Sequence, residues 1–179
     1  MTIGPEMNLR DLAFTVCTAL SREGVTAVLT GGGAATVYAP EACQSHDLDF
    51  ILQFSATTFA PPARPLELLG FTRRGGAYVH SATPFMVEFP AGPLAVGSEQ
   101  LTEWDTMADG DELLHILNPT DCVRDRLAWF LFNSDYSCLE QALAVARTQP
   151  VDVGVVERWC VAEGEREKFA VFRHRLSVV

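Results

Sequence analysis

The segments LTGGGAA (Leu29–Ala35) and SHDLDF (Ser45–Phe50) decide how the rest of the chain is interpreted. An apolar stretch, residues 25–30, is typical of a strand and leads into three glycines, and residues 34–39 can form a short helix. A strand, a glycine turn and a helix start place backbone N–H groups where a phosphate can approach closely. The glycines that we expect to bind a nucleotide phosphate are Gly31, Gly32 and Gly33.

Two aspartates follow in the next predicted strand, residues 46–53. Asp47 and Asp49 are two positions apart, so on a strand their carboxylates point to the same face. Their neighbours are apolar, and two carboxylates on one face of an apolar strand repel each other and resist burial. A divalent cation relieves both costs. Mg²⁺ (or Mn²⁺) suits the pair because it takes carboxylate oxygens and keeps water and substrate phosphates as its other ligands.

A third carboxylate, Glu88, lies in a further apolar strand predicted over residues 83–89. If this strand pairs with the strand of Asp47, three acids converge. Three carboxylates can hold two metal ions, which activate an attacking oxygen and stabilise a leaving phosphate. Ser45 precedes Asp47 by two residues, so its hydroxyl can join the same face and the nucleotide site.

The order of these motifs resembles that of the nucleotidyltransferase superfamily related to DNA polymerase β. Its signature is a strand, Gly-Gly or Gly-Ser, a short helix, an acid-x-acid strand and a later strand with a third acid. The chain looks most like minimal bacterial nucleotidyltransferases of toxin–antitoxin and abortive-infection systems. This resemblance covers residues 25–89 and continues weakly to about residue 143. It implies that Asp47, Asp49 and Glu88 are metal ligands and catalytic residues.

The resemblance also implies a reaction and partners. The reaction is metal-dependent transfer of a nucleoside monophosphate from a nucleoside triphosphate (NTP) to an acceptor hydroxyl. The acceptor classes are RNA such as a tRNA end, a protein side chain, and a small molecule such as an aminoglycoside. An antitoxin or a second copy of the chain is a further expected partner.

The chain departs from the toxin enzymes at its basic residues. Those enzymes usually have an arginine two residues before the serine, where this chain has Cys43, and a lysine on the helix after the sheet. Here the corresponding segment, Asn118–Val123, is followed by Arg124 and Arg126. Lys168 is the single lysine among 13 basic Lys and Arg residues. Arg124 and Arg126 are therefore the predicted phosphate-binding cations, although arginine and lysine are not equivalent.

Composition limits the class of protein. The chain has 179 residues, of which 48% are hydrophobic and 20% charged, so it can bury a core without disulfides. The net charge of −10 disfavours broad nucleic-acid binding. The number of cysteines, 5, is odd, and no C-x-x-C occurs, so a disulfide framework or zinc ribbon is not expected. No apolar run is long enough to span a bilayer, and we expect a cytoplasmic protein.

The remaining pattern predicts an α/β (α+β) fold. We expect a nucleotidyltransferase-like domain over residues 1–117, with a small mixed sheet and flanking helices. A helical C-terminal segment packed on that domain is expected over residues 118–179. The other predicted elements are helices over residues 8–22 and 66–70, a proline-rich turn over 60–65, a hairpin over 71–80, and helices over 119–132, 137–148, 152–162 and 165–176.

Three other interpretations compete with this one. Dinucleotide binding has some support, because Gly31-x-Gly33 precedes a helix and Asp49 lies at a suitable distance, but the third glycine position of the fingerprint falls on Thr36. A sugar transferase that uses D-x-D is usually larger, and the three glycines would be unexplained. The strongest rival is a nucleotidyltransferase fold that has lost catalysis and serves as a binding or scaffold protein. The missing lysine favours it, and three costly carboxylates argue against it.

Overall fold

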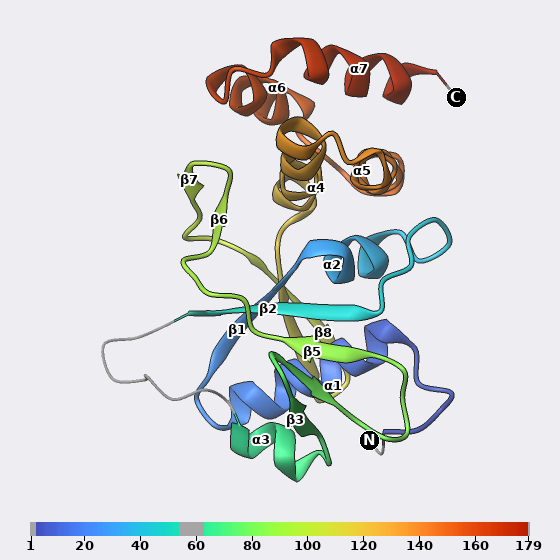
Figure 1. The fold of residues 1–179 in the computed structure, drawn as a ribbon, viewed down its shortest axis with the longest axis vertical. Coiled ribbons are helices and arrows are strands. Elements are labelled where there is room, and N and C mark those ends of the chain that lie inside the picture. The colour runs from blue at the N-terminus through green and yellow to red at the C-terminus, as the bar shows by residue number, and fades with distance from the viewer. Residues whose placement is uncertain (1–2, 54–62, 179) are drawn as a thin grey trace.

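The computed structural model describes residues 3–53 and 63–178. Figure 1 shows α1 and α3 on one side of the sheet, α2 on the other side, and α4 to α7 beyond α2 at the far end of the molecule. The elements are, in chain order, α1 (Leu9–Arg22), β1 (Thr26–Thr30), α2 (Gly31–Tyr38), β2 (Asp47–Gln53), α3 (Ala63–Leu68), β3 (Thr72–Arg74), β4 (Ala77–Val79), β5 (Met86–Glu88), β6 (Ala95–Val96), β7 (Glu99–Gln100), β8 (Asp105–Asp109), β9 (Glu112–Ile116), α4 (Pro119–Asn133), α5 (Tyr136–Thr148), α6 (Val153–Ala162) and α7 (Arg166–Ser177).

Seven strands form one mixed sheet in the order β3-β4-β5-β2-β1-β9-β8, and β6 with β7 forms a separate hairpin. Strand β1 is antiparallel to β2 and parallel to β9, and the central strand β2 is parallel to β5. This register places Thr30 opposite Asp49, and Asp49 opposite Glu88. The predicted fold class, a mixed α/β fold followed by a helical C-terminal region, is confirmed.

The helix starts follow their capping residues. The Asn8 side chain accepts a hydrogen bond from the backbone N–H of Asp11 at 2.9 Å, and Asn118 accepts one from Asp121 at 2.9 Å. Pro119 occupies the first turn of α4, where a backbone donor is not needed. The predicted starts of α1 and α4 are therefore confirmed.

Other boundaries differ from the prediction. The three glycines are not a turn before a helix at residue 34, because α2 begins at Gly31 itself and the glycines form its first turn. The short helix expected over residues 66–70 is α3, which begins at Ala63. Residues 63–65 of the expected proline-rich turn are thus helical, and residues 60–62 lie outside the described part of the chain. Four strands, β6 to β9, lie in residues 91–117, where the sequence predicted none.

The helical region shares one hydrophobic core with the sheet. Buried residues of α6 and α7, such as Trp159 and Phe172, belong to the same cluster as Leu29 and Phe50 of the central strands. Buried Tyr38 also joins the two regions: its backbone oxygen accepts a hydrogen bond from Nε2 of Gln149, at the end of α5, at 3.0 Å. The position of α4 and α5 over α2 is therefore part of the fold, while the division at residue 117 stays a prediction.

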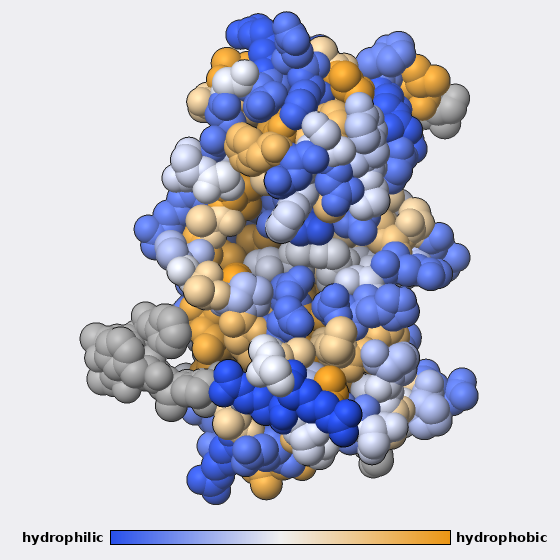
Figure 2. Space-filling model, in the orientation of Figure 1, coloured by the Kyte–Doolittle hydropathy of each residue, from blue (hydrophilic) through white to orange (hydrophobic). Residues whose placement is uncertain are grey.

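All five cysteines are buried and free, as expected from the sequence. Figure 2 shows hydrophilic and hydrophobic side chains interspersed over one face of the molecule. Within residues 3–53 and 63–178, no helix is long and apolar enough to cross a membrane.

We predict that Asn8→Ala destabilises the chain by about 1 kcal/mol, because one N–H at the start of α1 loses its acceptor. In a chain of this size the melting temperature should fall by about 2–4 °C. Asn8→Ser is the control, since serine also caps helices, and it should restore most of the loss in thermal unfolding. Equal losses in the two variants would contradict the capping role.

Candidate active site

Three acids lie on one face of the two neighbouring strands β2 and β5. Asp49 and Glu88 are partners in the parallel β2–β5 pair, and Asp47 lies two residues before Asp49. Side chains alternate between faces along a strand, so the three carboxylates share a face. All three residues are partly buried. The register of β2 with β5 confirms the expected pairing of the two acidic strands.

Placing these acids together is electrostatically costly. Burial raises the pKa of Asp49 to about 6, and repulsion from Glu88 and Asp47 adds to the shift. One carboxylate oxygen of Asp47, Oδ1, is buried without a hydrogen-bond partner. A buried carboxylate oxygen without a donor is unfavourable unless a cation or a ligand satisfies it.

Among the described residues, no group of three His, Cys, Asp or Glu side chains is arranged so that it could hold a metal ion. The three predicted ligands thus do not form a complete coordination set by themselves. Mg²⁺ is commonly bound by one or two carboxylates together with water and substrate phosphates. The unpartnered oxygen of Asp47 and the raised pKa of Asp49 fit such an incomplete site, with both carboxylates as ligands.

The first turn of α2 lies directly against these acids. Gly31 has φ +69°, and a Cβ placed on it would be 2.7 Å from Oδ2 of Asp49. A Cβ on Gly33 would be 3.0 Å from the backbone oxygen of Asp47. Thr30, the N-cap, makes no side-chain hydrogen bond to this turn. The glycines therefore allow an N-terminal helical turn without a side-chain cap to contact the acidic strand, a geometry that suits a phosphate.

Ser45 lies in the turn that precedes β2. Its Oγ donates to the backbone oxygen of Asp47 at 3.1 Å and accepts from the backbone N–H of Asp47 at 3.3 Å. A Cβ on Gly32 would be 3.1 Å from the same Oγ. Ser45 thus lies beside the glycine turn and also stabilises the turn that leads into the acidic strand.

Arg126 is the basic residue that the structure brings to the acids. Its Nη2 lies 3.6 Å from the Cβ position of Gly31, and its charge lowers the pKa of Asp49, opposing the other shifts. The guanidinium donates to Oδ2 of Asp125 from Nε at 3.0 Å and from Nη2 at 2.7 Å. Nη1 reaches Oε1 of Gln141 at 3.4 Å.

Asp125 and Gln141 were not singled out from the sequence. Asp125 precedes Arg126 directly, so its pairing could have been suspected from adjacency alone. Gln141 comes from α5, and no local pattern connects it with the α4 arginine. Both residues now belong to the surroundings of the candidate site, because each holds the guanidinium of Arg126.

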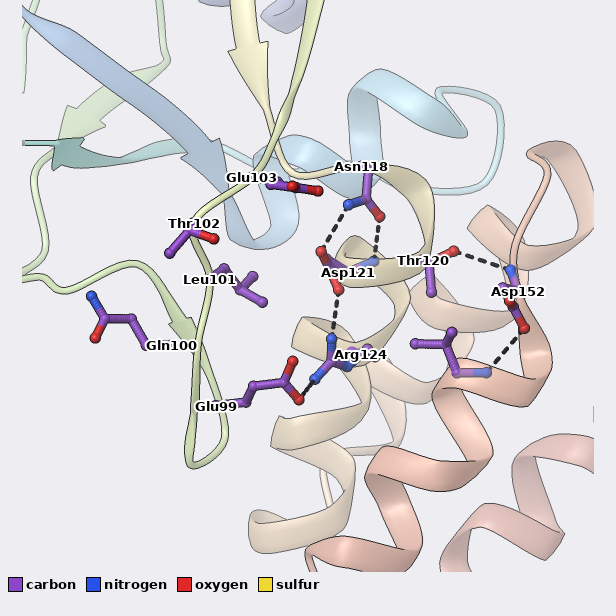
Figure 3. Close-up of a pocket in the computed structure, with 11 residues that line it drawn as sticks. Glu99, Gln100, Leu101, Thr102, Glu103, Asn118, Thr120, Asp121, Arg124 and Asp152 are labelled. Atoms are coloured by element: carbon purple, nitrogen blue, oxygen red, sulfur yellow. Dashed lines mark hydrogen bonds and ion pairs between the residues drawn. The ribbon is translucent and has the colours of Figure 1, made fainter.

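Arg124 is not brought to the same place. Two residues along a helix are rotated by about 200°, so Arg124 leaves α4 on a different side from Arg126. Its Nη1 donates to Oδ1 of Asp121 at 2.7 Å, and its Nη2 is paired with Glu99. Figure 3 shows it between these two acids, at the wall of a polar cavity of about 400 Å³.

The single lysine is also engaged elsewhere. Lys168 lies on α7, and its Nζ donates to the backbone oxygen of Leu131 near the end of α4. It lies 5.9 Å from the ring centre of Phe130. Of Arg124, Arg126 and Lys168, Arg126 is the one that lies near the glycine turn.

Comparison with known proteins supports the fold. No family model and no curated protein matches the chain. A solution structure of the antibiotic-resistance factor ANT(2'')-Ia, an aminoglycoside nucleotidyltransferase, matches with a TM-score of 0.51 and 12% sequence identity over 93% of this chain and 95% of that chain. The chain therefore shares the fold of that protein. At this identity the likeness concerns the fold alone, and it does not extend to the toxin–antitoxin resemblance.

The close approach of Gly31 to Asp49 can be tested by substitution. Gly31→Ala should destabilise the chain more than Gly75→Ala. Both glycines have positive φ, which costs about 1–2 kcal/mol for alanine, but only at Gly31 must a neighbouring group also move. Gly75 is the matched control because nothing lies within 4 Å of its Cβ position. If urea unfolding showed the same loss in the free energy of unfolding for Gly31→Ala and Gly75→Ala, Asp49 would not restrict Gly31.

The charge of Asp49 should make stability depend on pH. The ordinary pKa of an aspartate is about 3.9, and the pKa of Asp49 in the folded chain is about 6. Between these two pH values, Asp49 binds a proton in the folded chain and has released it in the unfolded chain. Stability due to this group is therefore greatest at low pH and is lost as pH rises through 6. Asp49→Asn should raise the melting temperature by about 2–4 °C at pH 7.5 and have little effect at pH 4. A gain of the same size at both pH values would contradict the raised pKa.

Proposed function

We propose that the chain transfers a nucleoside monophosphate from an NTP to the hydroxyl group of an acceptor. The observation that carries this proposal is the alignment of Asp47, Asp49 and Glu88 on one face, directly beside the glycine turn of α2. Carboxylates suit a divalent cation, and a helix N-terminus suits a phosphate. The nucleotidyltransferase fold supports the same reaction class.

Each residue has a role in this proposal. Asp47 and Asp49 hold Mg²⁺ or Mn²⁺, which when bound neutralises charge on the triphosphate and polarises the reacting phosphate. The three backbone N–H groups of the glycine turn, together with Ser45, hold the triphosphate. Glu88 accepts the proton of the acceptor hydroxyl. The oxygen of that hydroxyl bonds to the α-phosphorus, and the bond between the α-phosphorus and pyrophosphate breaks.

Arg126 takes the place of the lysine that the toxin enzymes use. An arginine has five N–H donors, and the contacts with Asp125 and Gln141 do not use all of them. Nη2 is the Arg126 atom near the Cβ position of Gly31, and it carries a second hydrogen. Arg126 can therefore donate to a phosphate oxygen at the glycine turn while it stays paired with Asp125.

The charge of the chain favours one acceptor class. A net charge of −10 repels the phosphates of RNA and attracts cationic small molecules. We therefore favour a small cationic acceptor with a hydroxyl group over a tRNA end or a protein side chain. An aminoglycoside is one compound of this kind, and the fold is shared with an aminoglycoside nucleotidyltransferase.

The second candidate function is a binding or scaffold protein without catalysis. Two observations favour it. The three acids do not form a ready metal-binding group among the described residues, and Lys168, the single lysine, is tied to α4. In this alternative, the chain binds a nucleotide or a partner antitoxin, or a second copy of itself, and no bond to phosphorus is formed.

Nucleotide binding should appear as thermal stabilisation that needs metal. With Mg²⁺ and an NTP at about 100 times its Kd, binding contributes about 2.7 kcal/mol, so the melting temperature should rise by several degrees. Asp49→Asn should lose this rise, and Arg126→Ala should weaken it. Asp111→Asn is the matched control, since exposed Asp111 lies in the β8–β9 turn. If no NTP changed the melting temperature, the proposed enzyme activity would be contradicted.

Labelled NTPs then separate the two functions. The wild type should label a small cationic acceptor, and total RNA and protein serve as the competing acceptors in parallel reactions. Label on RNA or protein instead would overturn the preferred acceptor class. Nucleotide binding without any labelled product would favour the scaffold.

A further inference from the structure

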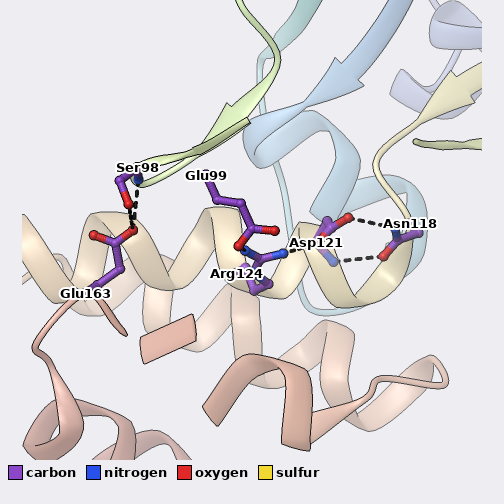
Figure 4. A network of polar contacts seen from close by, with 6 residues as sticks. All are labelled: Ser98, Glu99, Asn118, Asp121, Arg124 and Glu163. Atoms are coloured by element: carbon purple, nitrogen blue, oxygen red, sulfur yellow. Dashed lines mark hydrogen bonds and ion pairs between the residues drawn. The ribbon is translucent and has the colours of Figure 1, made fainter. Parts of the chain in front are cut away.

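Arg124 connects three separate elements. It is only 3% exposed, and it donates to Asp121 of its own helix, pairs with Glu99 of β7 and lies over the ring of Trp159 of α6 at 5.3 Å. Asp121 is itself held by Asn118, whose Nδ2 donates to Oδ2 of Asp121 at 2.8 Å. Figure 4 shows this chain of contacts along one side of α4.

The β6–β7 hairpin is fastened to the helices at a second point. The N–H and the Oγ of Ser98 both donate to Oε1 of Glu163 at 2.8 Å, beyond the end of α6. Gly97 has φ +58°, and a Cβ there would be 2.5 Å from the same Oε1. The hairpin therefore fits closely against the helical region and can hold Glu99 in a fixed place (Figure 4).

Burial of Arg124 is not explained by stability alone. Its Nε is buried and has no hydrogen-bond partner, which is costly. Buried ion pairs are often no more stable than apolar residues of similar volume. The Arg124–Glu99 pair instead restricts the rotation of α4 about its axis. A hydrogen bond depends on direction, whereas apolar contacts do not.

Arg126 needs such an external restraint. Its shortest contacts are with Asp125, which belongs to the same helix and turns with it, so this pair cannot fix the rotation of α4 relative to the sheet. Its contacts with α5 are both long: Nη1 lies 3.4 Å from Oε1 of Gln141 and 3.7 Å from Sγ of Cys138. The Arg124–Glu99 contact crosses from α4 to another part of the chain and can fix that rotation.

We propose that Arg124 is a positioning residue that, through Glu99 of the β6–β7 hairpin, sets the rotation of α4 and so holds Arg126 beside Gly31 and Asp49. The inference rests on the proposed function only in that the phosphates of a nucleotide are what Arg126 would contact. Arg124 itself touches no substrate in this arrangement.

Glu99→Ala tests the proposal, because Glu99 is half-exposed and its loss leaves the core intact. We expect the KM for the Mg²⁺-bound NTP to rise about tenfold with a much smaller change in kcat. Glu99→Gln should restore most of the affinity, since its amide oxygen still accepts from Arg124. Glu103→Ala is the matched control, because Glu103 lines the same cavity and should leave KM unchanged.

A double-mutant cycle shows whether Glu99 acts through Arg126. In an Arg126→Ala background, Glu99→Ala should cause no further rise in KM, since the two changes remove one and the same effect. Additive losses would overturn the proposal and leave Glu99 with an independent role.

A measurement without nucleotide separates this inference from the proposed function. The Nε–H of Arg126 is bonded to Asp125, so its proton signal in nitrogen-edited NMR should be observable. Glu99→Ala should shift this signal and speed its exchange with water, and Glu103→Ala should not. An unchanged signal in Glu99→Ala would overturn the inference. A shifted signal in a protein that binds no NTP would support the inference and contradict the proposed function.

Discussion

The contact between the first turn of α2 and the acidic strand β2 is the constraint on which the site depends. The antiparallel pairing of β1 with β2 places Thr30 opposite Asp49, and the chain turns into α2 at the next residue. Only a glycine at position 31 accepts both the positive φ and the neighbouring carboxylate oxygen. β5 then adds Glu88 beside Asp49, and α4 adds Arg126.

The charges around this contact do not balance locally. Three acids share one face, and the guanidinium that approaches them is already paired with a fourth acid, Asp125. A protein selected for stability alone gains little from a cluster of four acids and one arginine. An acid whose pKa is raised as that of Asp49 is raised is common where a ligand supplies the missing positive charge. The same features that make the site costly therefore make it a candidate for binding.

Much of this arrangement follows from local rules. The period of two along a strand predicts that Asp47 and Asp49 share a face, and Asn118 with Pro119 predicts the start of α4. Three of the four strands within residues 91–117 were missed because they are short or mainly exposed: β6 and β7 have two residues each, and only one residue of β8 is partly buried. Such strands form through pairing with their neighbours, which no local apolar pattern records.

The difference between Arg124 and Arg126 could not be predicted for another reason. Helical periodicity shows that the two side chains leave α4 on different sides, but not which side faces the sheet. That depends on how α4 packs on α2 and α5 and, in our proposal, on the contact of Arg124 with Glu99. Gln141 was missed for the same reason, whereas Glu88 could be predicted once one strand pairing was assumed.

The site draws on distant parts of the chain, and this has a consequence for synthesis. Its acids occupy positions up to Glu88, whereas Arg126 follows 38 residues later (126 − 88). At roughly 5–20 residues per second, the ribosome needs about 2–8 s to add that stretch. During those seconds the nascent chain carries its negative cluster without the cation that opposes it. Docking of α4 thus relieves repulsion in the sheet at the same step that completes the site.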